Sequence, residues 1–396
     1  MSFLAHNRAL MLVIAVTSLS ATGCLRSLTA GSGHMCVLKG EGAYCWGLNT
    51  VGQFGNGTTT SSLTPVRAAD RMRLKSVEAS AATSCGLDAK GAAFCWGDNT
   101  NGQLGKAQGN FLNTPTAIAG NHAFVKISTG NTGACALTKD GQAYCWGDNG
   151  NGQIGQGTLT GPDVCPSGRP CYLAPTAVGG NLAFAKISAH ESARCGITID
   201  KKVYCWGNPE FRQIGLAPQG STLPAGSTSS PLSVPVGTDL KVSTVTVGVF
   251  NACAIAEGGP PYCWGIQFLG DLGANASVGA CNLTSPPNPP CSPTPVAVEG
   301  SLRLAPYEEA FGATTVACGL TRDGAAFCWG NNKEGELGNG STVDYSQTPA
   351  AVSGGLHFRE IAVGGALVCA VTHGDRIYCW GTDYQNNRSN VPKRLK

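Results

Sequence analysis

One tripeptide, Cys-Trp-Gly, recurs seven times and accounts for every tryptophan in the 396-residue chain. Successive copies are 50 to 65 residues apart. A fixed period of about fifty residues is typical of stacked supersecondary units, in either a propeller or a solenoid. The chain is therefore expected to be a repeat protein, with its copies at Trp46, Trp96, Trp146, Trp206, Trp264, Trp329 and Trp380.

The third copy shows the unit most clearly. Its alternation of polar and apolar residues, with turn residues between, predicts four short strands in the order 114–118, 124–130, 135–137 and 143–146. The strand that bears Cys-Trp is the fourth of these, and a glycine-rich turn, 147–155, then leads to the next copy. Four strands match one propeller blade, so the seven copies predict an all-β, seven-bladed propeller of four-stranded antiparallel blades.

The chain ends suggest how the ring closes. Leu25–Gly31 stands in the second-strand position of the first copy, and Asn390–Leu395 resembles the first strand of a unit. We expect the N-terminal segment to supply three strands of a blade and the C-terminal segment the missing one, which leaves no open edge. Residues 24–396 are then one propeller domain.

The cysteines number 19, which is typical of a disulfide framework formed in an oxidising compartment. Each copy has one Cys before its Trp and another nine or ten positions earlier. If Cys135 faces Cys145, the hairpin loop is 139–141. In the shorter first copy the loop is 40–41, and hairpin loops of three and of two residues are both favoured. Zinc sites prefer closer cysteines. The predicted blade pairs are Cys36/Cys45, Cys85/Cys95, Cys135/Cys145, Cys195/Cys205, Cys253/Cys263, Cys318/Cys328 and Cys369/Cys379.

Two further pairs, Cys165/Cys171 and Cys281/Cys291, stand in enlarged gaps between a glycine-rich turn and the next first strand, and Cys24 is left over. Residues 1–23 predict a signal peptide, because Arg8 precedes a short apolar run that ends in small residues. The end of this segment resembles a lipobox, so Cys24 is the candidate lipidation site. The alternative is simple secretion. The expected location is extracytoplasmic, as an outer-membrane or cell-surface lipoprotein.

The stretches 86–105 and 136–155, which end in Gly-Gln-Leu-Gly and Gly-Gln-Ile-Gly, resemble the regulator of chromosome condensation repeat. The resemblance extends over nearly all of residues 25–396, and it implies a seven-bladed propeller. The chain resembles a bacterial secreted, lipoprotein-type member of this family. The seventh copy, Thr382–Asn387, lacks the Gly-Gln-Leu-Gly stretch. The family includes a nuclear guanine-nucleotide exchange factor, a plant ultraviolet sensor and a secreted β-lactamase inhibitor, so the resemblance implies no single activity.

Several function classes are disfavoured. A net charge of +3 without a basic run argues against nucleic-acid binding. The six histidines are scattered, and Asp140 and Asp323 fall in Asp-Gly turns. The sequence has no nucleophile elbow and no phosphate-binding loop. We therefore expect no enzyme, no metal and no cofactor, and we expect the tryptophans to pack the repeat.

The enlarged gaps Gly157–Ala174, Leu216–Pro231 and Ala274–Pro293 are the best indication of function. We expect them to be inter-blade loops that lie side by side on one face, where elaborated loops often bind partners; neutral drift is the alternative. The predicted function is non-enzymatic binding of a protein or glycan at a membrane. Nucleotide exchange on a small GTPase and a propeller hydrolase or lyase are the alternatives. The candidate binding residues are Asp163, Arg169, Tyr172, Phe211, Arg212, Asn275, Asn282 and Asn288.

Overall fold

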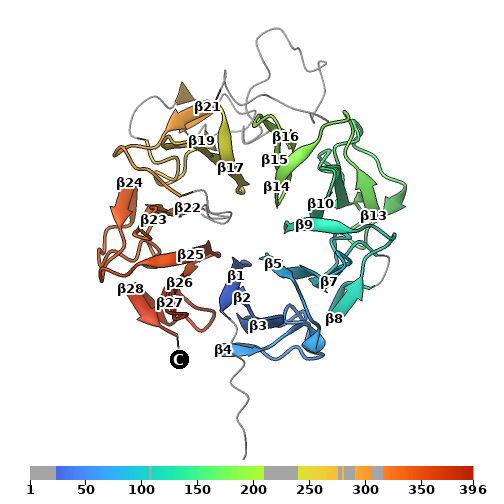
Figure 1. Cartoon of the computed structure of the whole chain (residues 1–396), viewed down its shortest axis with the longest axis horizontal. Coiled ribbons are helices and arrows are strands. Elements are labelled where there is room, and N and C mark those ends of the chain that lie inside the picture. Colours follow the sequence, from blue (N-terminus) through green and yellow to red (C-terminus); the bar gives the residue numbers. More distant parts are fainter. Residues whose placement is uncertain are drawn as a thin grey trace, which may run out of the picture.

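A computed structural model describes residues 24–106, 109–208, 240–274, 279–280, 290–305 and 315–395. Their strands form seven antiparallel sheets that stand around a central axis, so the predicted seven-bladed propeller is confirmed (Figure 1). We number the sheets as blades 1 to 7 in chain order. In each sheet the main strands pair in chain order, from the innermost strand outward.

The first three blades are described with all four of their main strands. Blade 1 comprises β1 (Leu25–Ala30), β2 (His34–Lys39), β3 (Gly42–Gly47) and β4 (Ser62–Arg67), and a single 3-10 turn, η1 (Ala69–Arg71), follows it. Blade 2 comprises β5 (Ser76–Ser80), β6 (Thr83–Leu87), β7 (Ala93–Asp98) and β8 (Phe111–Ala117). Blade 3 comprises β9 (Phe124–Thr129), β10 (Gly133–Thr138), β11 (Ala143–Asp148) and β13 (Pro170–Ala177), with the short β12 (Asp163–Val164) beside β13.

The remaining blades follow the same order within the described residues. Blade 4 comprises β14 (Phe184–His190), β15 (Ala193–Thr198) and β16 (Val203–Gly207). Blade 5 comprises β17 (Val242–Val247), β18 (Asn251–Ala256), β19 (Pro261–Ile266) and β21 (Pro290–Ala297), with β20 (Gly279–Ala280) at its edge. Blade 6 comprises β22 (Val316–Leu320), β23 (Ala326–Asn331) and β24 (Tyr345–Ala351), and blade 7 comprises β25 (Phe358–Val363), β26 (Leu367–Thr372), β27 (Ile377–Thr382) and β28 (Arg388–Arg394).

The predicted exchange of strands at the ring closure is wrong. The N-terminal segment forms all four strands of blade 1, and the C-terminal segment forms all four strands of blade 7. The physical reason is that each predicted first strand pairs with the Cys-Trp strand before it: Thr176 of β13 lies opposite Cys145 of β11. The two end blades instead meet through side chains and through a hydrogen bond from the Leu28 amide to the Glu360 carboxylate (2.8 Å).

The place of the Cys-Trp strand within its blade also corrects the prediction. Because each predicted first strand is the last strand of the preceding blade, the Cys-Trp strand is the third of its sheet and not the fourth. The partner cysteine lies on the second strand and not on the third. The predicted fourth-strand position is therefore wrong for the cysteine of each Cys-Trp strand. These cysteines are Cys45, Cys95, Cys145, Cys205, Cys263, Cys328 and Cys379.

The predicted pairing of the blade cysteines is confirmed, because it depends on one hairpin and not on where the blade begins. Cys135 lies opposite Cys145, and Gly141 in their turn has a φ of +85°, as expected for its left-handed position. Each blade disulfide joins Cα atoms 4.1 Å apart. The bonded pairs are Cys36–Cys45, Cys85–Cys95, Cys135–Cys145, Cys195–Cys205, Cys253–Cys263, Cys318–Cys328 and Cys369–Cys379.

The two loop pairs differ from the prediction in position. They were expected between blades, but Cys171 lies in β13 and Cys291 lies in β21, the outer strands of blades 3 and 5. Cys291 is buried opposite Ile266 of the Cys-Trp strand. The pair Cys165–Cys171 is bonded, as predicted. Cys291 is also part of a disulfide, and its predicted partner, Cys281, lies outside the described residues.

The up-and-down strand order gives the ring two different faces. The loop-rich face holds the connections from first to second strand and from third to fourth strand in each blade. The hairpin-tip face holds the turns between second and third strands and the links to the next blade. The insert 157–174 therefore lies within blade 3, where it runs from the loop after β11 into the start of β13, so its predicted inter-blade position is wrong. The same correction applies to the described ends of 274–293, between β19 and β21.

Candidate functional site

Five of the blade joints are made through one buried indole each. Trp146 of blade 3 donates from Nε1 to the carbonyl oxygen of Gln103 in blade 2 (3.0 Å), and Leu104 packs in the same apolar cluster as this Trp. A Cβ atom at Gly105 would come within 3.0 Å of the indole nitrogen, so only glycine lets the turn approach so closely. The same bond recurs as Trp96–Gln53, Trp206–Gln153, Trp329–Asp271 and Trp380–Glu336, at 2.7 to 3.1 Å.

A buried asparagine ties the following loop to four of these turns, those of blades 1, 2, 3 and 6. In blade 3, Asn149 accepts from the Ile154 amide (3.1 Å) and donates to the carbonyl oxygens of Thr158 (3.0 Å) and Thr160 (2.6 Å). This asparagine is fully buried, so its amide exchanges no bond with solvent. Asn49, Asn99 and Asn332 hold their own turns in the same way. The recurring Trp-Gly-Asp-Asn of the sequence was the signal for this role, which the sequence reasoning missed.

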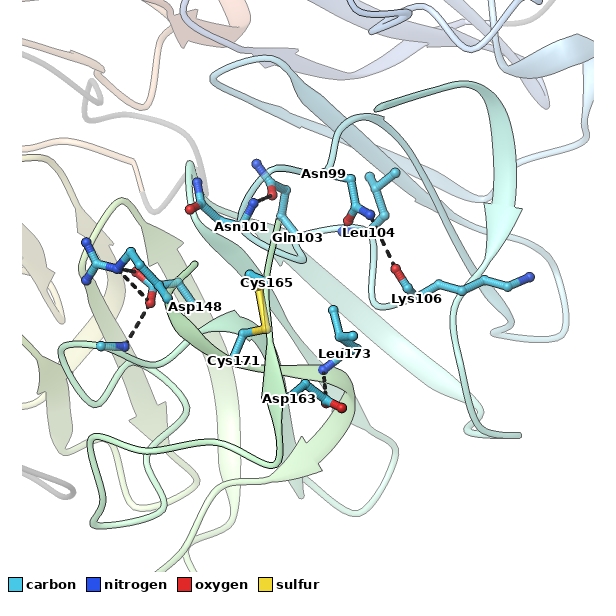
Figure 2. The surroundings of a disulfide bond; sticks show 12 residues. Asn99, Asn101, Gln103, Leu104, Lys106, Asp148, Asp163, Cys165, Cys171 and Leu173 are labelled. Carbon is cyan, nitrogen blue, oxygen red and sulfur yellow. Dashed lines mark hydrogen bonds and ion pairs between the residues drawn. A yellow bond between two sulfur atoms is a disulfide. The ribbon is translucent and has the colours of Figure 1, made fainter. Parts of the chain in front are cut away.

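The described insert, 157–174, packs onto the turn of the preceding blade. Its disulfide Cys165–Cys171 is buried and lies beside the turn that bears Asn101 and Gln103 (Figure 2). The Ser167 amide donates to the Thr100 carbonyl oxygen (2.8 Å), and a Cβ at Gly102 would lie 2.8 Å from Cys165 Sγ. The insert is therefore an ordered part of the loop-rich face, and its contacts connect blade 3 to blade 2.

Three of the predicted binding residues are in this insert. The Asp163 carboxylate accepts from the Leu173 amide (3.0 Å; Figure 2). Arg169 Nε pairs with the buried carboxylate of Asp148 (3.0 Å). Tyr172 packs against the apolar cluster of blades 3 and 4. Arg169 is the most exposed of the three, with 46% of its side chain open to solvent. The predicted Phe211, Arg212, Asn275, Asn282 and Asn288, and the whole of Leu216–Pro231, lie outside the described residues.

Among the described residues, large exposed apolar side chains are more numerous on the loop-rich face than on the hairpin-tip face, and they are spread over blades 1, 2, 3, 5 and 6. Val164 is 73% exposed on the insert, and Val343 is 63% exposed on the β23–β24 loop. Leu63, Phe111 and Tyr345 stand at the loop-rich ends of their outermost strands, and Leu269 is in the loop after β19. By contrast, the hairpin-tip end of the ring bears Ile199 and Val125. The described part of the loop-rich face therefore exposes more large apolar side chains than the described part of the hairpin-tip face.

A cavity of about 540 Å³ lies where blade 7 meets blade 1. Gly31–Gly33, Trp46 and Leu48 line it from blade 1, and 381–384 and 386–389 line it from blade 7. Trp46 is only 3% exposed, yet its Nε1 has no hydrogen-bond partner. A second, smaller cavity, of about 110 Å³, lies on the ring axis between the innermost strands.

Two buried histidines and a buried arginine lie near the inner strands. Burial lowers the pKa of His34 and of His190 to about 4, and His34 Nε2 lies 2.9 Å from Ser84 Oγ. Burial also lowers the pKa of Arg194 to about 10, and this guanidinium donates to the Ala193 carbonyl oxygen (2.8 Å).

The two predicted turn acids behave as turn residues. Thr138 donates to the Asp140 carboxylate (2.5 Å), and this hydrogen bond lowers the pKa of Asp140. Thr321 does the same for Asp323. Both carboxylates are therefore engaged within their own hairpins, which is the role that the Asp-Gly spacing predicts.

Sequence comparison identifies the repeat. The regulator of chromosome condensation (RCC1) repeat matches in two versions, one at residues 25–53, 74–103 and 124–153 and the other at 42–87, 90–137 and 323–371. These matches coincide with the strands and turns of blades 1 to 3, 6 and 7. This propeller therefore contains RCC1 repeats, at residues 25–153 and 323–371.

Curated relatives match this RCC1-repeat propeller over part of their length. The RCC1 domain-containing protein RUG3, mitochondrial, of Arabidopsis thaliana is 27% identical over 223 residues, which is 53% of this chain and 44% of RUG3. The ultraviolet-B receptor UVR8 of the same plant is 26% identical over 49% of this chain and 40% of its own length. The human E3 ubiquitin-protein ligase HERC2 is 28% identical over 51% of this chain and 4% of its own. The match therefore spans less than half of each relative.

Solved structures share the fold of the RCC1-repeat propeller. Yeast RCC1 (Prp20), solved bound to Kap60, superposes with a TM-score of 0.72 at 16% identity, over 95% of this chain and 86% of that one. Human WBSCR16 gives 0.69 at 20% identity, over 87% and 85%. The CRINKLY ectodomain of the Arabidopsis thaliana receptor kinase ACR4 gives 0.52 at 19% identity, over 94% and 99%. Identities this low establish the fold alone.

Two further features are absent from the described part of the RCC1-repeat propeller. No helix among those residues is long and apolar enough to cross a membrane. The same residues contain no group of three or more His, Cys, Asp or Glu side chains placed to hold a metal ion.

Proposed function

We propose that this protein is a non-enzymatic, extracytoplasmic scaffold that binds a partner protein on its loop-rich face and is held at a membrane by a lipid on Cys24. The observation that supports binding on this face is the larger number of exposed apolar side chains there, of which Val164 and Val343 are the most exposed. Protein interfaces bury such side chains at their centre. The rigid turns beneath them, held by buried Asn149 and Asn332, keep the surface ordered before a partner arrives.

The disulfides favour export. Eight bonded pairs are described, seven of them inside blade cores, and such a framework forms and persists in oxidising compartments. Two ectodomains of plant receptor kinases share the fold, at 17% and 19% identity. Both observations support an extracytoplasmic place for this propeller.

The position of Cys24 fits an anchor. Cys24 is exposed and forms no disulfide, and the next residue, Leu25, donates its amide to the Asp375 carboxylate (3.2 Å) at the tip of the β26–β27 hairpin. The chain therefore enters the ring from the hairpin-tip face. A lipid on Cys24 would hold that face toward the membrane and turn the loop-rich face toward partners.

Solved relatives support a protein as the ligand. The yeast RCC1 propeller was solved bound to Kap60, and a second study of Prp20p describes its binding to Gsp1p and histones. An apolar surface also fits a protein better than a glycan, because sugar rings present many hydroxyl groups that need hydrogen-bond partners.

The test compares one pair of variants with a matched control. The double change Val164→Asp and Val343→Asp places two charges on the loop-rich face, and Ile199→Asp places one on the hairpin-tip face, where Ile199 is 64% exposed. Proteins that co-isolate with the wild type from membranes of the native host should be lost with the double variant and kept with Ile199→Asp. Equal recovery from all three proteins would contradict the proposal. A partner that survives protease treatment of the extract would identify a glycan instead.

A further inference from the structure

We infer that the seam between blade 7 and blade 1 is a peptide-binding site, which accepts from a partner protein the kind of turn that this chain supplies to itself at the other described blade joints. The inference deepens the proposed function and rests on it, since the seam is lined by loops of the same loop-rich face. Its test is independent of the surface residues Val164 and Val343.

The described joints show what an occupied site looks like. At each, the turn of one blade gives a carbonyl oxygen to the indole of the next blade and buries an apolar side chain beside it. Blade 2 gives the Gln103 carbonyl oxygen and Leu104 to Trp146, and blade 6 gives the Glu336 carbonyl oxygen and Leu337 to Trp380. Leu104 and Leu337 are at most 1% exposed. The joint is thus a pocket for a Gln-Leu-Gly or Glu-Leu-Gly turn.

The seam has the same pocket without the turn. The connection between β27 and β28 is only 383–387, whereas that between β23 and β24 is 332–344. The short connection also closes on itself, because the Asp383 carboxylate accepts from the amides of Gln385 (2.9 Å) and Asn387 (3.0 Å). Asp383 occupies the place that Asn332 has in blade 6, but no apolar side chain follows it at the position of Leu337.

The indole of Trp46 therefore stands as a buried donor that nothing in the described chain satisfies. It is 3% exposed, Nε1 has no partner, and the space beside it is about 540 Å³. This volume is within the range of ligand-binding clefts. A buried N–H group gains most from a ligand that brings an acceptor, because it has lost its bond to bulk water.

The chemistry of the walls matches a short peptide turn. Leu48, Leu367 and Met35 offer apolar surface for a leucine or isoleucine side chain. Gly31 and Gly33 have no side chain to fill the cavity on the blade 1 side, and a Cβ at Gly33 would lie 2.6 Å from Leu48 Cδ1. The expected ligand is a surface loop with a free carbonyl oxygen followed by Leu, Ile or Phe and then Gly.

The test uses a probe taken from blade 2. The peptide acetyl-Asn-Thr-Asn-Gly-Gln-Leu-Gly-amide copies residues 99–105, and a control peptide has Asp in place of Leu. The protein is labelled with ¹⁵N-tryptophan, and the spectrum of Trp46→Phe identifies the Trp46 indole signal. The peptide should shift this signal in a saturable way and slow its hydrogen exchange, whereas the control peptide should do neither.

Two variants separate the hydrogen bond from the fold. Trp46→Phe keeps the apolar ring but removes the donor, and it should weaken peptide binding about tenfold, measured from the methyl signals of Leu48. Trp96→Phe, whose donor is already used within the chain, should bind as the wild type does. Replacing 383–387 by the sequence of 332–344 should fill the seam and abolish binding while the β-sheet circular dichroism signal is kept.

Three results would overturn the inference. One is an unshifted Trp46 signal at millimolar peptide. Another is equal binding by Trp46→Phe and wild type. The third is slow exchange of the Trp46 indole without peptide, which would show that residues 1–23 or a second copy already fill the seam. None of these results affects the co-isolation experiment with the Val164 and Val343 variants, so each proposal can fail without the other.

Discussion

Trp96 Nε1 in blade 2 donates a 2.7 Å hydrogen bond to the carbonyl oxygen of Gln53 in blade 1. Both groups are buried, and a Cβ at Gly55 would lie 2.7 Å from the same indole. This contact explains why the tryptophan and the glycine-rich turn recur together: the turn of one copy completes the blade that follows it. Among the described joints, the one at Trp46 lacks the completing turn.

The contribution of the indole hydrogen bond to the free energy of unfolding should differ between joints. Trp96→Phe leaves the buried Gln53 carbonyl oxygen without this donor and should lower the free energy of unfolding by about 1–2 kcal/mol. Trp46→Phe removes a donor that has no partner, so it should cost less than Trp96→Phe. Urea unfolding followed by far-ultraviolet circular dichroism measures both. Equal losses would mean that the Trp46 indole is bonded in solution.

The buried asparagines should control the order of the loops above them. Asn149→Ala removes one bond to the Ile154 amide and two to the insert, at Thr158 and Thr160. We expect a loss of about 1–3 kcal/mol and faster amide hydrogen exchange in 157–169. The control is Asn151→Ala, at a neighbouring position of the same turn where the backbone amide, and not the side chain, bonds to Gln153. Similar exchange in both variants would contradict the tying role of Asn149.

Acid should weaken the fold through its buried histidines. Burial lowers the pKa of His34 to about 4, while its pKa in the unfolded chain stays near 6.5. The unfolded state therefore binds more protons between these values, so the contribution of neutral His34 is complete above about pH 6.5 and is lost as the pH falls toward 4. His34→Gln should remove roughly 3 kcal/mol of this pH dependence.

The measurement for His34 is the difference in unfolding free energy between wild type and His34→Gln at several pH values. The difference cancels the carboxyl groups common to both proteins, including Glu336 and Glu360, whose pKa values burial raises. His357→Gln, at an exposed position, is the matched control. A difference that does not change between pH 7 and pH 4 would show that His34 is hydrated in solution.

The two kinds of disulfide should have separable roles. Cys135→Ser with Cys145→Ser opens a bridge inside blade 3 and should cost about 2–3 kcal/mol of stability. Cys165→Ser with Cys171→Ser opens the insert on the loop-rich face, and it should reduce partner capture more than it reduces the melting temperature. Thermal unfolding and co-isolation, measured on the same preparations, compare the two. The opposite ranking would show that the insert supports the fold and not binding.

Much of the fold could be predicted because it depends on local spacing. The Cys135–Cys145 register follows from one hairpin loop, and the shorter first hairpin kept Cys36 opposite Cys45. The closure, and with it the rank of the Cys-Trp strand in each blade, could not be predicted in the same way, because a repeating sequence does not show which strand begins a blade. Thr176 pairs with Cys145, and this pairing decides where each sheet ends.

The candidate site was less predictable, since its contacts join residues that are far apart in the sequence. Arg169 was expected to face a partner, and its pairing with Asp148 depends on a 21-residue loop folding back. At the five joints with an indole hydrogen bond, the Trp side chain and the carbonyl oxygen that it contacts are 43 to 58 residues apart in the sequence. The missing turn of the seventh copy was visible in the sequence, but its consequence for Trp46 needed the closed ring.

The central claim, that the loop-rich face is the binding surface, can be tested by site-specific photo-crosslinking. A benzophenone amino acid replaces Val164 on the insert or, as the control, Ile199 on the opposite face; both side chains are more than half exposed. In cells of the native host, illumination should give one protein adduct of defined mass from position 164 and none from position 199. An adduct from position 199 alone, or the same adduct from both, would contradict the account.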